Sequence, residues 1–123
     1  MEEIIWNIET YETGSGEKIV DEFIKKQQPQ AKSKIAHTIN LLKLYGNKLG
    51  LPHSKALGSG LYELRTRGKE ELRIFYCFAP QKTIFLLHGF KKQTQQTPSK
   101  ELNIALQRKK SLTSSTTLSV NTE

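Results

Sequence analysis

The chain has 123 residues, the size of one small domain, and its 19 Lys and Arg against 12 Asp and Glu give a net charge of +7. This charge favours a polyanionic partner: nucleic acid, an anionic membrane surface or an acidic protein. A lone cysteine excludes an intramolecular disulfide framework, no run approaches the ~18 apolar residues of a membrane span, and the acidic start lacks the basic segment of a signal peptide. We therefore expect a cytoplasmic protein of a reducing compartment, with no metal and no cofactor.

The charge is unevenly distributed along the chain. Residues 1–23 hold seven acidic residues and one lysine, whereas residues 24–110 hold 18 basic and four acidic residues. The excess of positive charge therefore belongs to the middle and C-terminal parts. For the lysines on predicted helices, the simplest interpretation is a solubilised surface.

Three elements are predicted in the N-terminal part. Ile4, Trp6 and Ile8 alternate with polar residues, which predicts a strand with one buried face. After a Gly-rich break, apolar residues at helical spacing predict a helix that ends at Gln28. Pro29 is well placed as the first residue of a second helix, which ends at Gly46. The two helices form a predicted helical hairpin.

Strands dominate the middle of the chain. Residues 46–60 are rich in Gly and Pro and are predicted to form a loop. Three strand-like runs follow, at 61–67, 72–79 and 83–91. The short links between these runs suit antiparallel hairpins and cannot hold the crossover that parallel strands need.

The last predicted helix begins near Pro98 and covers residues 99–110. Residues 111–123 include eight Ser and Thr without periodicity, which predicts a disordered tail after a domain of residues 1–110. The expected order is β-α-α-β-β-β-α. This is an α+β fold in which an antiparallel sheet packs against the N-terminal helical hairpin, with a C-terminal helix in addition.

Alternation along the strands assigns the arginines to one face of the sheet. The even-numbered side chains of 62–66 are the better set for packing against helices, so Arg65 and Arg67 are expected on the opposite, open face. Arg73 lies inside an apolar run, where an unpaired guanidinium is very costly. Two interpretations are open: Arg73 is a cation that waits beside Arg65 for a phosphate, or it forms an ion pair with Glu63 across the hairpin.

The composition argues against a metal-dependent nuclease. Asp21 is the one aspartate and the basic region offers only scattered glutamates, whereas a two-metal nuclease needs clustered carboxylates. Metal-free RNA cleavage needs no such cluster, because the 2′-OH attacks its own phosphate while the protein orients the chain, moves protons and neutralises charge. The candidates for neutralising charge are Arg65, Arg73 and Lys91, and the candidates for moving protons are His53 and His88.

Two of the reactive side chains also have a structural interpretation. His88, in an apolar run, is equally expected as a hydrogen-bonded core histidine. Cys77 lies in the middle of another apolar run, so we interpret it as a small core residue rather than a nucleophile.

Four short motifs resemble a known family. They are Leu-Pro-His-Ser-Lys at 51–55, Gly-Leu-Tyr-Glu-Leu-Arg at 60–65, Leu-Arg-Ile-Phe-Tyr at 72–76, and Leu-His-Gly-Phe-Lys-Lys-Gln-Thr at 87–94 followed by Thr97-Pro98. With these motifs in this order, the chain from residue 3 to residue 108 resembles the phage-derived HigB-like branch of the RelE/ParE toxin superfamily.

The resemblance implies the toxin of a type II toxin–antitoxin pair, a metal-independent, ribosome-dependent endoribonuclease that cleaves mRNA. It also implies a cognate antitoxin, usually of the helix-turn-helix type. The implied catalytic residues are Arg65, Arg73 and Lys91, and the implied supporting RNA contacts are Lys55, Arg67 and Lys92. In the family a hydrophobic residue often separates the Phe of the last motif from two lysines. This sequence departs from that pattern, which leaves open whether Lys91 or Lys92 faces the active surface.

Two other functions stay open at this level. A ParE-like toxin of the same fold would inhibit DNA gyrase and cleave nothing. A non-catalytic regulatory domain would use the same cations only to hold RNA phosphates. The cluster of cations on the sheet favours RNA over gyrase, but phosphate binding and phosphate cleavage use the same residue types.

Overall fold

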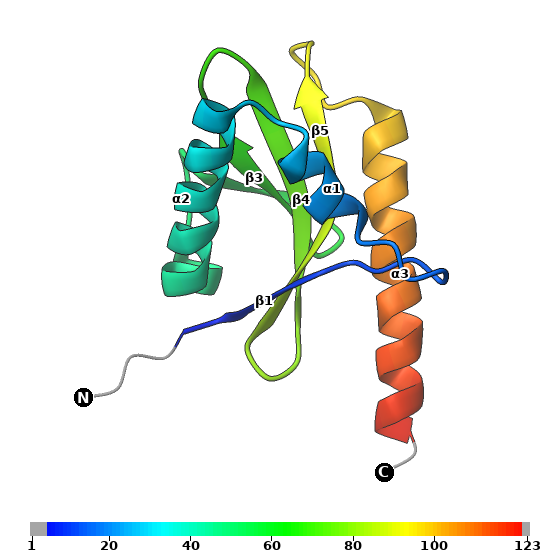
Figure 1. The fold of residues 1–123 in the computed structure, drawn as a ribbon. Coiled ribbons are helices and arrows are strands. Elements are labelled where there is room, and N and C mark those ends of the chain that lie inside the picture. The colour runs from blue at the N-terminus through cyan, green and yellow to red at the C-terminus, as the bar shows by residue number, and fades with distance from the viewer. Residues whose placement is uncertain (1–4, 122–123) are drawn as a thin grey trace, which may run out of the picture.

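The computed structural model describes the backbone of residues 5–121 and the side chains of residues 5–112. Five strands form one sheet in the order β1-β5-β4-β3-β2. They are β1 (Asn7–Thr10), β2 (Ser54–Gly58), β3 (Leu61–Thr66), β4 (Glu71–Ala79) and β5 (Thr83–Lys92). The helices are α1 (Ile19–Lys25), α2 (Pro29–Tyr45), a short 3₁₀ helix (Gly46–Lys48) and α3 (Ser99–Asn121) (Figure 1). The predicted α+β class and the helix pair near the N-terminus are confirmed.

The sheet is mixed rather than wholly antiparallel. Strands β3, β4 and β5 pair antiparallel, as their short links require. In contrast, β1 pairs in parallel with β5, with Asn7 opposite Thr83. The link lengths carry no information about this pair, because two helices and three strands separate β1 from β5 along the chain.

Strand β2 lies inside the segment that the composition predicts as a loop. Its residues, Ser54–Gly58, include no β-branched and no aromatic side chain, so propensity gives no signal for a strand. It is extended because it pairs with β3 at the edge of the sheet. The Ser54 hydroxyl also shares a buried hydrogen bond with the Tyr76 hydroxyl of β4.

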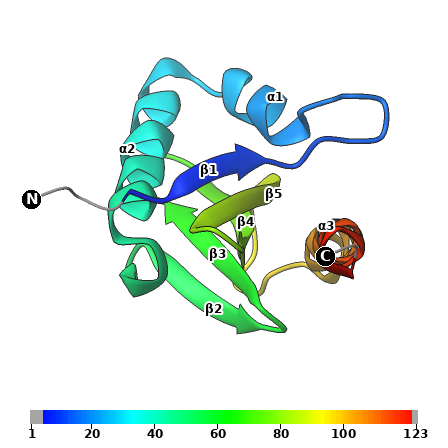
Figure 2. The ribbon, with the colours of Figure 1, turned by 90° about the horizontal axis from the view of Figure 1, so that it is seen from below.

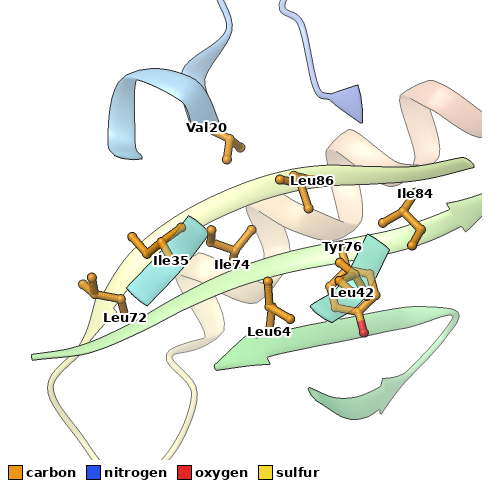
Figure 3. Close-up of a cluster of buried hydrophobic side chains, with 9 residues drawn as sticks. All are labelled: Val20, Ile35, Leu42, Leu64, Leu72, Ile74, Tyr76, Ile84 and Leu86. Atoms are coloured by element: carbon orange, nitrogen blue, oxygen red, sulfur yellow. The ribbon is translucent and has the colours of Figure 1, made fainter. Parts of the chain in front are cut away.

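Helices α1 and α2 cover one face of the sheet. Val20, Ile35 and Leu42 pack there against apolar side chains of β3, β4 and β5 (Figure 3). Helix α1 approaches β5 closely at Gly89, where a Cβ would lie 2.4 Å from the ring of Phe23. The glycine of the Leu-His-Gly-Phe motif therefore has a packing role.

Helix α3 covers the opposite face, for which the alternation pattern predicts an open surface. Phe75, Leu87 and Phe90 pack there with Ala105 of α3 in a second core. Figure 2 shows α3 on the side of the sheet away from α1 and α2. Side chains on both faces of the central strand β4 are buried, which is typical of a strand covered on both sides. The expectation of a wholly open face is therefore wrong.

Helix α3 continues past Lys110, where the sequence predicts the tail to begin. Its backbone is helical to Asn121. The side chains from residue 113 onward and all of residues 122–123 lie outside the described residues, so the disorder of this tail stays a prediction. Among the residues described, no helix has both the length and the apolarity that crossing a bilayer takes.

Candidate functional site

The strand register places most of the predicted cations on a common face. Arg65 of β3 lies opposite Arg73 of β4, and Glu71 of β4 lies opposite Lys92 of β5. Lys55 of β2 belongs to the same face through its register with β3. Residues directly opposite each other share a face of a sheet, and so do alternate residues of one strand. Lys55, Arg65, Arg73 and Lys92 therefore form what we call the cationic face, on the side of the sheet where α3 packs.

A buried carboxylate lies between the two arginines. The side chain of Glu63 is 1% exposed, and its Oε1 accepts a hydrogen bond from Nε of Arg65 at 3.2 Å and lies 3.7 Å from Nε of Arg73. The other carboxylate oxygen accepts a 3.4 Å hydrogen bond from the Thr97 hydroxyl. Glu63 thus offsets the repulsion between two guanidinium groups that share one register position.

Arg73 is 4% exposed and engages a second carboxylate. Its Nη2 donates a 2.9 Å hydrogen bond to Glu71, and its Nη1 donates a 3.3 Å bond to the carbonyl of Leu72. Of the two interpretations open from the sequence, the ion pair with Glu63 is the one observed, and Arg73 is not a free cation. The physical reason is the high cost of burying an unpaired guanidinium. The Glu71 side chain is 43% exposed, so water can replace Arg73 as its partner far more easily than it can at the buried Glu63.

A hollow of about 470 Å³ opens beside Arg73. Its lining residues are Glu71, Arg73, Lys92, Gln93, Thr94 and Gln95. We call it the loop hollow, because residues 93–95 belong to the connection between β5 and α3. Guanidinium, ammonium, amide and hydroxyl groups in this lining can all donate hydrogen bonds to an anion.

The register separates Lys91 from Lys92. Lys91 lies opposite Leu72, whose side chain belongs to the core beneath α1 and α2, and its Nζ forms an ion pair with Glu70. Lys92 lines the loop hollow with Arg73, and among the described residues it has no ion-pair partner. The structure therefore brings Lys92 to the arginines, and not the Lys91 that the resemblance places there.

Arg67, the last of the predicted RNA contacts, lies beyond the end of β3 and is exposed. It lines a second hollow, of about 480 Å³, where α2 faces the end of β3. Strand β2 begins at Ser54, which lies opposite Leu64, so the residues of β3 after Leu64 form the edge of the sheet. One further backbone hydrogen bond is made on that side, from the Arg65 amide to the His53 carbonyl at 2.8 Å. We call this the edge hollow. Its lining residues are Ser33, Lys34, His37, Thr38, Pro52, His53, Arg65, Thr66 and Arg67.

Two residues of the edge hollow are absent from the sequence-based candidates. Lys34 and His37 are exposed on α2 and line the hollow together. Their spacing of three residues, which places both on one side of a helix, was the available signal. Nothing in the local pattern says that this side of α2 faces the arginines, because that depends on how α2 packs on the sheet.

The two candidate acid–base histidines have different surroundings. Nε2 of His88 lies 2.6 Å from Oε1 of Glu101, and its Nδ1 lies 3.4 Å from Nη1 of Arg108. His88 is therefore a hydrogen-bonded residue between β5 and α3, as its structural interpretation predicts. His53 lines the edge hollow with Arg65, and among the described residues its side chain has no hydrogen-bond partner.

Burial governs the titration of the core groups. It raises the pKa of the Cys77 thiol to about 11, with the positive charge of Lys109 as a smaller opposing effect. Burial also raises the pKa of Tyr76, and the hydrogen bond with Ser54 partly offsets this shift. Cys77 is 4% exposed, so its interpretation as a small core residue is confirmed.

The family described as Phage derived protein Gp49-like (DUF891) matches residues 22–110 of this chain. The match begins within α1 and leaves β1 out. It includes every residue of the cationic face and of both hollows. No curated protein matches the chain.

Proposed function

Because the chain belongs to the phage derived protein Gp49-like family, a family of RelE-like toxins, we propose that it is the toxin of a type II toxin–antitoxin pair and cleaves mRNA on the ribosome. Within the RelE/ParE superfamily we assign it to the HigB-like branch. One observation supports the proposal of ribonuclease activity. Arg65 and Arg73 lie opposite each other and are oriented by Glu63, and Arg73 lines the loop hollow together with Lys92.

The proposed reaction needs no co-reactant. The ribose 2′-oxygen attacks the adjacent phosphorus, and the bond from phosphorus to the 5′-oxygen of the next nucleotide breaks. One proton leaves the 2′-OH and one reaches the 5′-oxygen, so the products are a 2′,3′-cyclic phosphate and a 5′-hydroxyl. Negative charge grows on the phosphate oxygens, where fixed cations stabilise the transition state.

Arg73 is the proposed ligand of the RNA phosphate. Before RNA binds, the carboxylate of Glu71 occupies the position that the phosphate would take. The carboxylate of Glu71 accepts a hydrogen bond from Nη2 of Arg73 and is the exposed member of the pair. A phosphate that enters the loop hollow would displace it and accept the same bond. Glu63 is buried and would keep the guanidinium in its orientation during this exchange.

His53 is the better supported of the two acid–base candidates. It lies at the edge hollow near Arg65, whereas His88 is already bonded to Glu101. An imidazole nitrogen can accept the proton of the 2′-OH as a general base.

The proposed partner is a cognate antitoxin of the helix-turn-helix type. Residues 24–110 hold 18 basic and four acidic residues, so we expect the antitoxin to present an acidic segment to the cationic face. Such a segment would compete with RNA for the same cations.

Transcript ends mapped after induction of this chain in bacteria test the activity. We expect growth arrest and new mRNA ends in phase with codons. The Arg73→Lys variant keeps one positive charge beside Glu63 and Glu71 but loses the planar fork, so it should fold and yield at least about tenfold fewer ends. Arrest without new ends would support gyrase inhibition instead, and RNA binding without arrest would support a regulatory domain.

A further inference from the structure

Positive charge is neutralised in one part of this surface and not in another. Three glutamates pair with the cations of the predicted catalytic set: Glu63 and Glu71 with the arginines, and Glu70 with Lys91. The edge hollow, in contrast, has Lys, Arg and His side chains in its lining but no Asp or Glu. Within the described part of the chain, neither Lys34 nor Arg67 has an ion-pair partner.

The edge hollow continues into a neighbouring hollow. This neighbouring hollow, of about 260 Å³, lies at the β3–β4 turn, where Lys69 and Glu70 line it, and it shares Lys34, Thr66 and Arg67 with the edge hollow. At the other end, Arg65 lines the edge hollow and lies opposite Arg73. The basic surface is therefore an elongated track along the edge of β3, and it leads toward the loop hollow.

An elongated track suits a linear polyanion better than a single anion. Guanidinium and ammonium groups bind phosphate oxygens without reading the base, and the exposed His37 offers a ring against which a base can stack. The lining of the edge hollow has no carboxylate, so its cations are available to the phosphates of a nucleic-acid strand. These features favour single-stranded RNA over an acidic protein.

We propose that the end of the edge hollow formed by Lys34 and Arg67 binds backbone phosphates of single-stranded RNA, next to the arginine pair where the strand is cut. The proposal rests on the proposed function only for the choice of RNA as the ligand. In this proposal Lys34 and Arg67 are RNA-binding residues, and their removal lowers the affinity for RNA of any sequence.

The test compares RNA binding by two charge-matched double variants. The probe is a fluorescein-labelled 2′-O-methyl oligouridine of about 12 nucleotides, a length within the site sizes of single-strand binding domains. It cannot be cleaved, because its 2′-oxygens are methylated. Fluorescence anisotropy over a range of salt concentrations gives the affinity of the wild type, of Lys34→Ala/Arg67→Ala and of the control Lys43→Ala/Lys48→Ala. The control removes two exposed lysines outside all the hollows described.

We expect the Lys34→Ala/Arg67→Ala protein to bind about tenfold more weakly at low salt, with a slope of log K against log salt shallower by about 1.4, since a single-strand phosphate contact contributes about 0.7. The control should bind like the wild type. An equal loss in both double variants would overturn the proposal, because it would reflect net charge alone. An equal weakening of polyglutamate binding by Lys34→Ala/Arg67→Ala would overturn the choice of RNA.

The two proposals fail in different assays. If the cleavage proposal is wrong, induced cells show no new transcript ends, and the binding difference between the double variants persists. If the edge hollow does not bind RNA, transcripts are still cut while Lys34→Ala/Arg67→Ala binds the probe as tightly as the control does.

Discussion

Arg65 of β3 and Arg73 of β4 lie directly opposite each other, on one face of the sheet. Two like charges at such a position repel, and the desolvation of a buried guanidinium adds to the cost. Oε1 of Glu63 lies 3.2 Å from one Nε and 3.7 Å from the other, so a single buried carboxylate orients both groups. The carboxylate of Glu63 therefore offsets the repulsion within this pair of arginines.

The Glu63→Gln variant tests this role. Removing the charge leaves the buried Arg73 and the partly buried Arg65 with only the exposed carboxylate of Glu71, so we expect the free energy of unfolding to fall by about 3 kcal/mol. Urea titration followed by circular dichroism measures it. Glu70→Gln is the control, because it breaks an exposed ion pair with Lys91 and should cost less than about 1 kcal/mol. Equal effects of the two variants would contradict the role given to Glu63.

Two neighbouring lysines form a matched pair for the activity. Lys92 lines the loop hollow with Arg73, whereas Lys91 lies on the other face. We expect Lys92→Ala to reduce new transcript ends about 100- to 1,000-fold, the size of effect typical for one group that stabilises transition-state charge. Lys91→Ala should leave cleavage within about twofold, and both variants should keep the wild-type free energy of unfolding within about 0.5 kcal/mol. A larger loss from Lys91→Ala would mean that the loop hollow is not where RNA is cut.

Gly89 is expected to tolerate no side chain. A Cβ at this position would lie 2.4 Å from the ring of Phe23, so Gly89→Ala must displace this ring or the α1 helix that carries it. We expect it to lower the free energy of unfolding by about 1–3 kcal/mol. Gly14→Ala is the control, since a Cβ there meets nothing within 4 Å. A thermal melt that is unchanged in Gly89→Ala would show that α1 packs differently.

The buried thiol makes stability depend on alkaline pH. The pKa of Cys77 is about 11 in the folded protein against an ordinary value of 9.0. Below pH 9 both states keep the proton and stability is unaffected. Between pH 9 and pH 11 the unfolded thiol ionises first, so stability should fall by up to about 2–3 kcal/mol.

Tyr76, whose pKa burial also raises, adds a loss in the same direction above pH 10. Urea midpoints of the wild type and Cys77→Ala from pH 7 to pH 10.5 measure the Cys77 contribution, which should be missing from the variant. In the native protein the thiol should also react slowly with a disulfide reagent at pH 8, and quickly once urea unfolds the chain. An identical pH dependence in the two proteins would contradict the shift assigned to Cys77.

The sequence by itself determined that Arg65 and Arg73 share a face. Side chains alternate in a strand with a period of two, and short links between β3, β4 and β5 require antiparallel pairing. Both facts are local, so they can be recognised without a structure. The structure shows the same alternation in β4, where Ile74 belongs to one core and Phe75 to the other.

The tertiary structure alone decided which of Lys91 and Lys92 joins the arginines. The pairing of β4 and β5 contains an irregularity at Leu87, between His88, which lies opposite Phe75, and Leu86, which lies opposite Tyr76. One extra residue in a strand reverses the alternation beyond it, so strict alternation from Leu86 would place Lys91 on the arginine face.

The cover of α3 and the approach of Lys34 to Arg65 are equally non-local. Each joins segments far apart in the chain, and docking geometry rather than periodicity brings them together. Local patterns therefore assigned the two arginines to one face, while long-range packing decided which cations are neutralised by a carboxylate and which have no ion-pair partner among the described residues.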